Sequence, residues 1–252
     1  IPKAYYDWYY NHTYNEANRE PEPISADTVL QWKRACEVEI AKRGLQFHDI
    51  GHGWNAEAFG ISTTDGWVKD ESNPIPEEAR QYLALINGKR DLFKGVALNT
   101  NFCMSNAKAR SIVSKTVCDY AEANSHVTYL HVWLADYQKN HCECDVCRTK
   151  RPSDWYIMLL NDIDEELTKR KLATRIVYCV YSDTAYEPTC EYIKNPARFT
   201  MLMGAISRSY TYSVEKDPTV EELTPFVLNK SARLDTLEEY IVRANLWRNF
   251  AP

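Results

Sequence analysis

The sequence predicts an α/β fold built on parallel strands, and we expect a (β/α)8 barrel of the TIM type. Apolar runs of strand length alternate along the chain with segments in which apolar residues recur at helical spacing. The run 127–135 is almost continuously apolar, which is typical of a strand buried on both faces of a parallel sheet. No glycine motif for dinucleotide or phosphate binding follows a strand, so the barrel is favoured over an open nucleotide-binding sheet.

The first part of the chain predicts two strands joined by a helix. Residues 4–10 form an aromatic extended run and residues 45–50 a short apolar one. Ser25 offers the side-chain oxygen that caps a helix N-terminus, and Gly44 offers the left-handed residue that ends a helix. Between them an apolar stripe at helical spacing is expected to face the core: Val29, Trp32, Cys36 and Ile40.

The middle of the chain predicts a loop-rich excursion followed by regular structure. A short helix is expected at 76–86 and a third strand at 95–99. Either Ser105 or Asn106 can cap the next helix, which precedes the apolar strand 127–135. The residues of that helix expected to face inward are Ile112, Val113, Val117, Tyr120 and Ala121.

The last part predicts two strands and two helices. Ser153 is expected to cap a helix, strands are expected at 175–181 and 199–206, and a final helix at about 235–247. Only about six strands are recognised where a closed barrel needs eight. We therefore expect residues 1–252 to be a single, partial barrel domain of a larger multidomain protein.

Composition narrows the classes of partner. The chain has 252 residues, 44% of them hydrophobic, which is enough for a large core. Its net charge is −5 with acidic and basic residues interspersed, so we expect no nucleic-acid partner. Its apolar runs are far shorter than the roughly 20 residues that span a bilayer, so no membrane span is expected. Of the eight cysteines, Cys36, Cys118 and Cys179 lie in apolar patterns and are expected in the core.

The candidate site consists of residues beyond the C-terminal ends of the strands, where barrel enzymes place their chemistry. Asp136 ends the strand 127–135 and is the first candidate for a general acid; Asp183 is its candidate counterpart and Glu187 a third candidate carboxylate. Asp136 could instead cap a helix or form a turn, and Glu187 could only shape the loop before Pro188. Amides and arginine bind hydroxyls or a uronate, and rings stack on sugars. The candidate substrate-binding residues are Trp8, His48, His52, Trp54, Asn101, Trp133, Tyr137, Tyr181 and Arg208.

His52 lies between two glycines, which let the backbone turn sharply and bring the imidazole to a cavity. A structural histidine bonded to a carbonyl oxygen is the alternative. Trp54 in the same loop can act as a sugar platform or as a lid over the core.

The cysteine cluster Cys142-x-Cys144-x-x-Cys147 can supply three thiolates to one Zn²⁺. A fourth ligand would come from Cys103, His141 or Cys190, and with four protein ligands the zinc would be structural, so no cofactor is required for catalysis. The alternatives are one disulfide, from Cys142 or Cys147 to Cys103 or Cys190, or free thiols.

Several short motifs carry a family resemblance. They are Gly51-His52-Gly53-Trp54, Asn87-Gly88-Lys89-Arg90, Asn101-Phe102-Cys103-Met104-Ser105-Asn106, Trp133-Leu134-Ala135-Asp136 and the cysteine cluster. From about Tyr5 to Tyr210 the chain resembles the bacterial domain-of-unknown-function family 4838, which looks like a distant relative of the α-glucuronidase barrels. The resemblance implies a barrel in a larger protein exported by polysaccharide-degrading bacteria, hence an extracytoplasmic location. The general acid of α-glucuronidases is a glutamate after a central strand, and this sequence has Asp136 at that place.

Together these observations predict a glycoside hydrolase-like barrel that acts on a polysaccharide or oligosaccharide, including uronic-acid-containing ones, by carboxylate general acid/base chemistry. Its partners would be the carbohydrate and the remaining domains of the parent protein. Two alternatives remain at this point: a carbohydrate-binding barrel without catalysis, and a zinc-dependent hydrolase with an open metal position.

Overall fold

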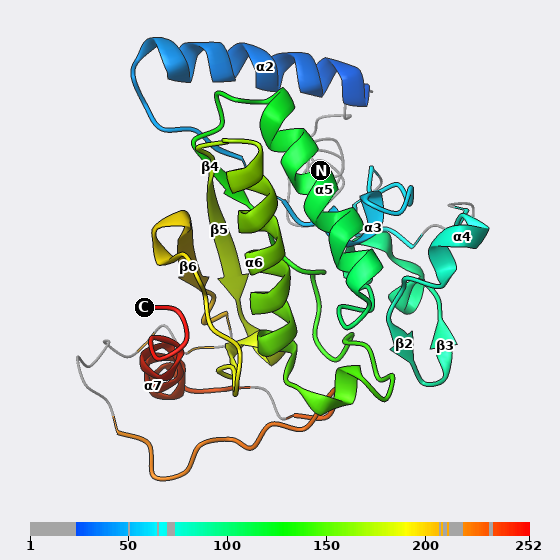
Figure 1. Cartoon of the computed structure of the whole chain (residues 1–252), viewed down its shortest axis with the longest axis vertical. Coiled ribbons are helices and arrows are strands. Elements are labelled where there is room, and N and C mark those ends of the chain that lie inside the picture. The colour runs from blue at the N-terminus through cyan, green and yellow to red at the C-terminus, as the bar shows by residue number, and fades with distance from the viewer. Residues whose placement is uncertain are drawn as a thin grey trace.

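The computed structural model describes residues 24–49, 51–64, 66–69, 74–206, 208, 211, 219–231 and 234–252. A four-stranded parallel sheet in the order β1-β4-β5-β6 forms its centre (Figure 1). The strands are β1 (His48–Asp49), β4 (Tyr129–His131), β5 (Arg175–Val180) and β6 (Phe199–Met203). The α/β class and the parallel sheet are confirmed. The strand expected at 4–10, with Trp8, lies outside the described residues.

Two long helices, α5 (Ala107–Ala123) and α6 (Pro152–Lys169), lie side by side against one face of the sheet (Figure 1). Their apolar stripes share one core with the inward side chains of β4 and β5, including Leu130 and Ile176. Of the two caps predicted for α5, Asn106 is the one used: its side chain accepts the N–H groups of Lys108 and Ala109. Because the four strands are parallel, their carboxyl ends lie at one edge of the sheet.

The cap predicted for α6 is wrong by two residues. The helix begins at Pro152 with Arg151 as N-cap, because a proline fits the first helical position, where its missing N–H has no partner to lose. Asp154 accepts the Arg151 N–H (3.1 Å) and so completes the cap in place of Ser153.

Helix α2 (Ala26–Lys42) has the predicted Ser25 cap, but its predicted inward stripe is wrong. Trp32 is 52% exposed and Cys36 is exposed, whereas Glu37 is buried. The helix docks through charged groups: Lys33 Nζ lies 2.8 Å from Asp49 Oδ1, and Glu37 accepts from Arg34 and His126. Apolar spacing therefore did not identify the packed face. Cys118 and Cys179, by contrast, are buried as predicted.

The short helix expected at 76–86 is present over part of that range, and the strand expected at 95–99 is wrong. The first is only the short helix α4 (Glu77–Arg80), followed by a hairpin of β2 (Leu85–Ile86) and β3 (Lys89–Arg90). Asn87 and Gly88 form its turn with φ of 49° and 77°, the left-handed pair that a two-residue hairpin loop requires. The second is a pair of 3₁₀ turns, Phe93–Gly95 and Ala97–Asn99, and β1 pairs directly with β4.

The last helix, α7 (Leu237–Trp247), is confirmed close to its predicted bounds, with Thr236 as its cap. It packs beside the 3₁₀ turn Ser182–Ala185 that follows β5, where the Trp247 indole N–H donates to the Ala185 carbonyl (3.1 Å). None of the helices in the described ranges combines the length and the apolar character that a bilayer crossing needs.

Candidate carboxylate site and thiol cluster

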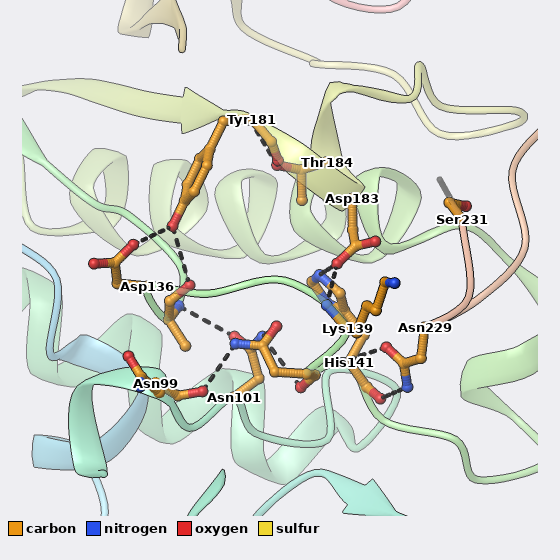
Figure 2. Close-up of polar contacts among 12 residues, drawn as sticks. Asn99, Asn101, Asp136, Lys139, His141, Tyr181, Asp183, Thr184, Asn229 and Ser231 are labelled. Carbon is orange, nitrogen blue, oxygen red and sulfur yellow. Dashed lines mark hydrogen bonds and ion pairs between the residues drawn. The ribbon is translucent and has the colours of Figure 1, made fainter. Parts of the chain in front are cut away.

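The segments that follow β1, β4 and β5 meet at the carboxyl edge of the sheet. The Trp133 N–H donates to the Gly51 carbonyl (3.1 Å), which joins the segment after β4 to the segment after β1. The Tyr181 hydroxyl, from the residue after β5, donates to Asp136 Oδ1 (2.9 Å) (Figure 2). Parallel strands bring their ends to one edge, and the structure brings Asp136 and Tyr181 together there.

Both carboxylate oxygens of Asp136 accept a hydrogen bond. Oδ1 accepts from Tyr181, and Oδ2 accepts from the indole N–H of Trp67 (2.8 Å). The Asp136 side chain is 37% exposed and the Trp67 side chain 44%, so the pair lies at the surface of the edge. Sequence reasoning missed Trp67; a tryptophan next to a glycine in a polar loop was the available signal.

His52 lies beside this carboxylate. Its Nδ1 is 2.7 Å from the Leu134 carbonyl, so Nδ1 carries the proton and Nε2 faces Asp136 Oδ1 at 3.9 Å. Burial lowers the pKa of His52 in spite of the nearby carboxylate, so the ring is neutral at pH 7. Gly53 has a φ of 113°, which confirms that a glycine is needed to turn the chain here.

Two further predicted residues line the same region. The Trp133 ring meets the His52 ring edge to face, with centroids 5.0 Å apart, and its buried indole nitrogen has no hydrogen-bond partner among the described residues. Tyr137 is 42% exposed; its hydroxyl accepts from Lys94 (2.5 Å), whose ammonium also lies 4.1 Å from the ring centroid. The edge thus combines exposed rings and a carboxylate with a buried indole N–H that has no partner in the described part of the chain.

Asp183 has a different environment from Asp136. It is buried, and its Oδ2 accepts the Lys139 N–H (2.5 Å) and lies 3.9 Å from His141 Nε2. Figure 2 shows it turned toward Lys139 and His141. Burial lowers the pKa of His141, so its ring is neutral at pH 7. The structure therefore places this predicted counterpart in a buried polar pair.

Glu187 is held by two arginines. Its Oε1 lies 2.8 Å from Arg151 Nη1, at the start of α6, and its Oε2 lies 2.9 Å from Arg243 Nη1, on α7. Burial alone would raise the pKa of Glu187, but the arginines outweigh it and lower the pKa. The carboxylate joins two helices, and its hydrogen bonds leave it little freedom to move a proton.

The remaining predicted binding residues serve other contacts. His48 stacks on Tyr129, Trp54 donates its indole N–H to the His131 carbonyl (3.0 Å), and the Arg208 N–H donates to Ala205. Asn101 is buried in a hydrogen-bonded set of asparagines next to Asp136. Among the described residues, neither His48 nor Trp54 has a hydrogen bond or ring contact with Asp136.

The four cysteines Cys103, Cys142, Cys144 and Cys147, here called the thiol cluster, lie together beneath the β2–β3 hairpin. Their Sγ atoms all lie within 4.8 Å of one another, with Cys103 3.7 Å from Cys144 and 3.8 Å from Cys147. All eight cysteines of the chain are free, so the disulfide alternative is not the arrangement found. The thiol cluster can hold a metal ion, and Cys190 is exposed and outside it.

The surroundings of the thiol cluster suit negatively charged sulfur. Cys142 Sγ accepts the Leu85 N–H (3.3 Å), and Cys144 Sγ accepts the Cys147 N–H (3.4 Å). Hydrogen bonds from the neighbouring thiols lower the pKa of Cys103, whereas hydrogen bonding to Cys103 raises the pKa of Cys142 to about 11 and raises the pKa of Cys147. Burial would lower the pKa of Arg90, but the adjacent cysteines outweigh it and raise the pKa, so a fixed positive charge faces the sulfurs.

Comparison with known proteins gives one match. The family model described as "Domain of unknown function (DUF4838)" matches residues 9–225, which is most of the chain. No curated protein and no solved structure matches the sequence.

Proposed function

The chain belongs to the DUF4838 family, and on that premise we propose that it is a carbohydrate-active domain of the glycoside hydrolase type. In this proposal the parallel sheet is part of a (β/α)8 barrel, and Asp136 is the carboxylate that contacts the sugar. The substrate is a polysaccharide or oligosaccharide, with uronic-acid-containing glycans among the candidates. An extracytoplasmic location and the other domains of the parent protein as partners complete the proposal.

One observation carries it: a part-exposed carboxylate lies between aromatic rings at the carboxyl edge of a parallel sheet. Asp136 offers hydroxyl-accepting oxygens, and the exposed faces of Trp67 and Tyr137 suit the apolar faces of sugar rings. The indole N–H of Trp133 can donate to a bound hydroxyl or water.

Hydrolysis of a glycoside by carboxylates uses two of them, about 5–10 Å apart. Asp183 and Glu187 are committed to the buried contacts described above, so we place the counterpart of Asp136 outside the described residues. Both Asp136 oxygens accept hydrogen bonds, and an indole N–H can only donate. This arrangement suits a base, a nucleophile or a hydroxyl acceptor better than the general acid expected from the sequence.

A second candidate is carbohydrate binding without hydrolysis. The observation that favours it is that the side-chain contacts described for Asp136 are with Tyr181, Trp67 and His52, and none of these residues is a carboxylate. Binding needs only the acceptor and the rings.

The Asp136→Asn variant of the intact protein separates these functions. On a glycan library, a hydrolase is expected to lose about 10²- to 10⁴-fold in turnover, measured as released reducing ends. A binding domain is expected to lose about 10- to 100-fold in affinity, because a charge-assisted hydrogen bond is worth about 1.5–3 kcal/mol. Asp235→Asn, exposed just before α7, is the control and should change neither. Wild-type turnover together with wild-type affinity in Asp136→Asn would refute the proposal.

The thiol cluster supports a structural Zn²⁺. A tetrahedron with Zn–S bonds of about 2.3 Å has S···S edges of about 3.8 Å, and the measured Cys103–Cys144 and Cys103–Cys147 separations are 3.7 and 3.8 Å. The Leu85 and Cys147 N–H groups and Arg90 would offset the charge of four thiolates. Four thiolates leave no position for a catalytic water, so the geometry does not favour a zinc-dependent hydrolase.

We expect purified protein to contain about one zinc per chain, measured by elemental analysis. The double variant Cys142→Ser/Cys147→Ser should lose this stoichiometric zinc. Wild-type protein loaded with Co²⁺ should show the absorption spectrum of a tetrahedral thiolate site. Cys190→Ser, outside the thiol cluster, is the matched control and should bind like wild type. Full metal content in the double variant, or no metal in wild type, would contradict the assignment.

A further inference from the structure

The thiol cluster and Asp136 are connected by two chain segments that run together. Asn101 lies two positions before Cys103, and Asn140 lies two positions before Cys142. At the other end of the same segments, the Asp136 N–H donates to the Leu98 carbonyl (2.8 Å). Each segment therefore has one end at the thiols and the other at the carboxylate.

Buried asparagines cross-link the two segments between these ends (Figure 2). Asn101 Nδ2 donates to Asn140 Oδ1 (2.9 Å), and Asn140 Nδ2 donates to the Asn99 carbonyl (2.8 Å). Asn101 Oδ1 accepts the Ala135 N–H (3.2 Å), one residue before Asp136. We call Asn99, Asn101 and Asn140 the asparagine network.

The side chains of Asn101 and Asn140 have their hydrogen-bonding atoms paired, whereas Asn99 contributes its backbone carbonyl and its buried side-chain oxygen has no partner among the described residues. Asn101 is 1% exposed and Asn140 is fully buried. The Asn101 amide oxygen accepts twice, from Ala135 and from Asn55 (2.8 Å), so neither oxygen nor nitrogen is idle. A buried network of this kind holds one arrangement, because any shift leaves a polar group without a partner in a low dielectric.

We infer that Asn101 and Asn140 are positioning residues that couple the thiol cluster to the Asp136 site. A bound ion fixes the separation of the segments at Cys103 and Cys142, and the amide cross-links carry that register to Ala135 and Asp136. The inference rests on the proposed function, since it assigns the metal a role at the proposed sugar-contacting carboxylate. In this inference the metal helps to set the position of the Asp136 carboxylate. A metal that only stabilised the fold would have no such effect.

The indole N–H of Trp67 reports on Asp136, because it donates to Oδ2. We would record its ¹⁵N–¹H resonance, assigned with Trp67→Phe, in intact protein loaded with Zn²⁺ and then with the larger ion Cd²⁺. Both ions are expected to bind the same four thiolates, so the two forms should differ only in the size of the ion. In wild type the resonance should move between the two ions. In Asn140→Ala it should already be displaced with Zn²⁺, and the difference between ions should shrink to within error.

Asn124→Ala is the matched control, because Asn124 is also a buried asparagine whose amide bonds the backbone, at the end of α5. It should keep the wild-type response. Asn55→Ala removes one donor to Asn101 and gives a milder variant if Asn140→Ala does not fold; it should reduce the response in part. If the Trp67 resonance of wild type has the same position with Zn²⁺ and with Cd²⁺, and metal is shown to be bound in the same sample, the coupling is refuted but the zinc proposal is not. Absence of bound metal would overturn the zinc proposal as well, and neither result bears on sugar binding.

Discussion

Replacing Arg243 with methionine is expected to lower the free energy of unfolding by about 3–5 kcal/mol. The guanidinium is 2% exposed and lies 2.8 Å from Glu239 and 2.9 Å from Glu187, and it donates to the Thr224 carbonyl (2.6 Å). Methionine fills a similar volume, so the loss comes from leaving two carboxylates in a poorly solvated place with fewer partners. The free energy of unfolding is measured by urea denaturation, with tryptophan fluorescence as the signal.

Arg248→Met, at the exposed C-cap of the same helix, is the control and should change the free energy of unfolding by less than about 0.5 kcal/mol. Equal stability of the two variants would show that the Glu187 pairs do not hold α6 and α7 together. It would also reopen a chemical role for Glu187, which the sequence suggested and which the ion pairs argue against.

The sequence predicted the parts of the fold that leave a short-range pattern of apolar residues. The apolar runs at β4 and β5 and the periodic stripes of α5 and α6 carry enough information to place a parallel sheet and its covering helices. The inward face predicted for helix α2 was wrong because the helix packs through ion pairs with residues distant in sequence. An apolar pattern does not record such pairs. The Asn87-Gly88 dipeptide is a hairpin signal, but the expected helix extended to residue 86 and so covered the first strand of the hairpin.

Some residues of the candidate sites could likewise be predicted from the sequence, and others could not. The spacing of Cys142, Cys144 and Cys147 predicts three converging thiols, whereas the choice of Cys103 as the fourth needs the fold. Asp136 was predictable because it follows the apolar run that contains β4, although the strand itself ends earlier, at His131. Its partner Trp67 was not, because that contact joins two loops, and loop geometry leaves no periodic trace in sequence.

Replacing Asp154 with alanine is expected to be about as costly as losing Arg243, at about 3–5 kcal/mol, since a hydrogen bond to a charged group contributes about 1.5–3 kcal/mol and several are lost together. The Asp154 carboxylate is fully buried. It accepts the N–H groups of Thr189 (2.8 Å), Cys190 (2.9 Å) and Glu191 (3.0 Å), and the Thr189 hydroxyl (2.9 Å). It therefore ties the loop after Glu187 to the start of α6. Glu165→Ala, on the same helix and exposed, should cost under about 1 kcal/mol.

The same carboxylate predicts an acid dependence of stability. Burial would raise the pKa of Asp154, but the backbone N–H groups of Cys190, Thr189 and Glu191 outweigh it and lower the pKa. Because the folded pKa lies below the unfolded value of about 3.9, the stabilisation is complete above that value. It is lost as the pH falls through the folded pKa. Between about pH 5 and pH 2, wild type should therefore lose more unfolding free energy than Asp154→Ala; parallel losses would show that Asp154 is not the group responsible.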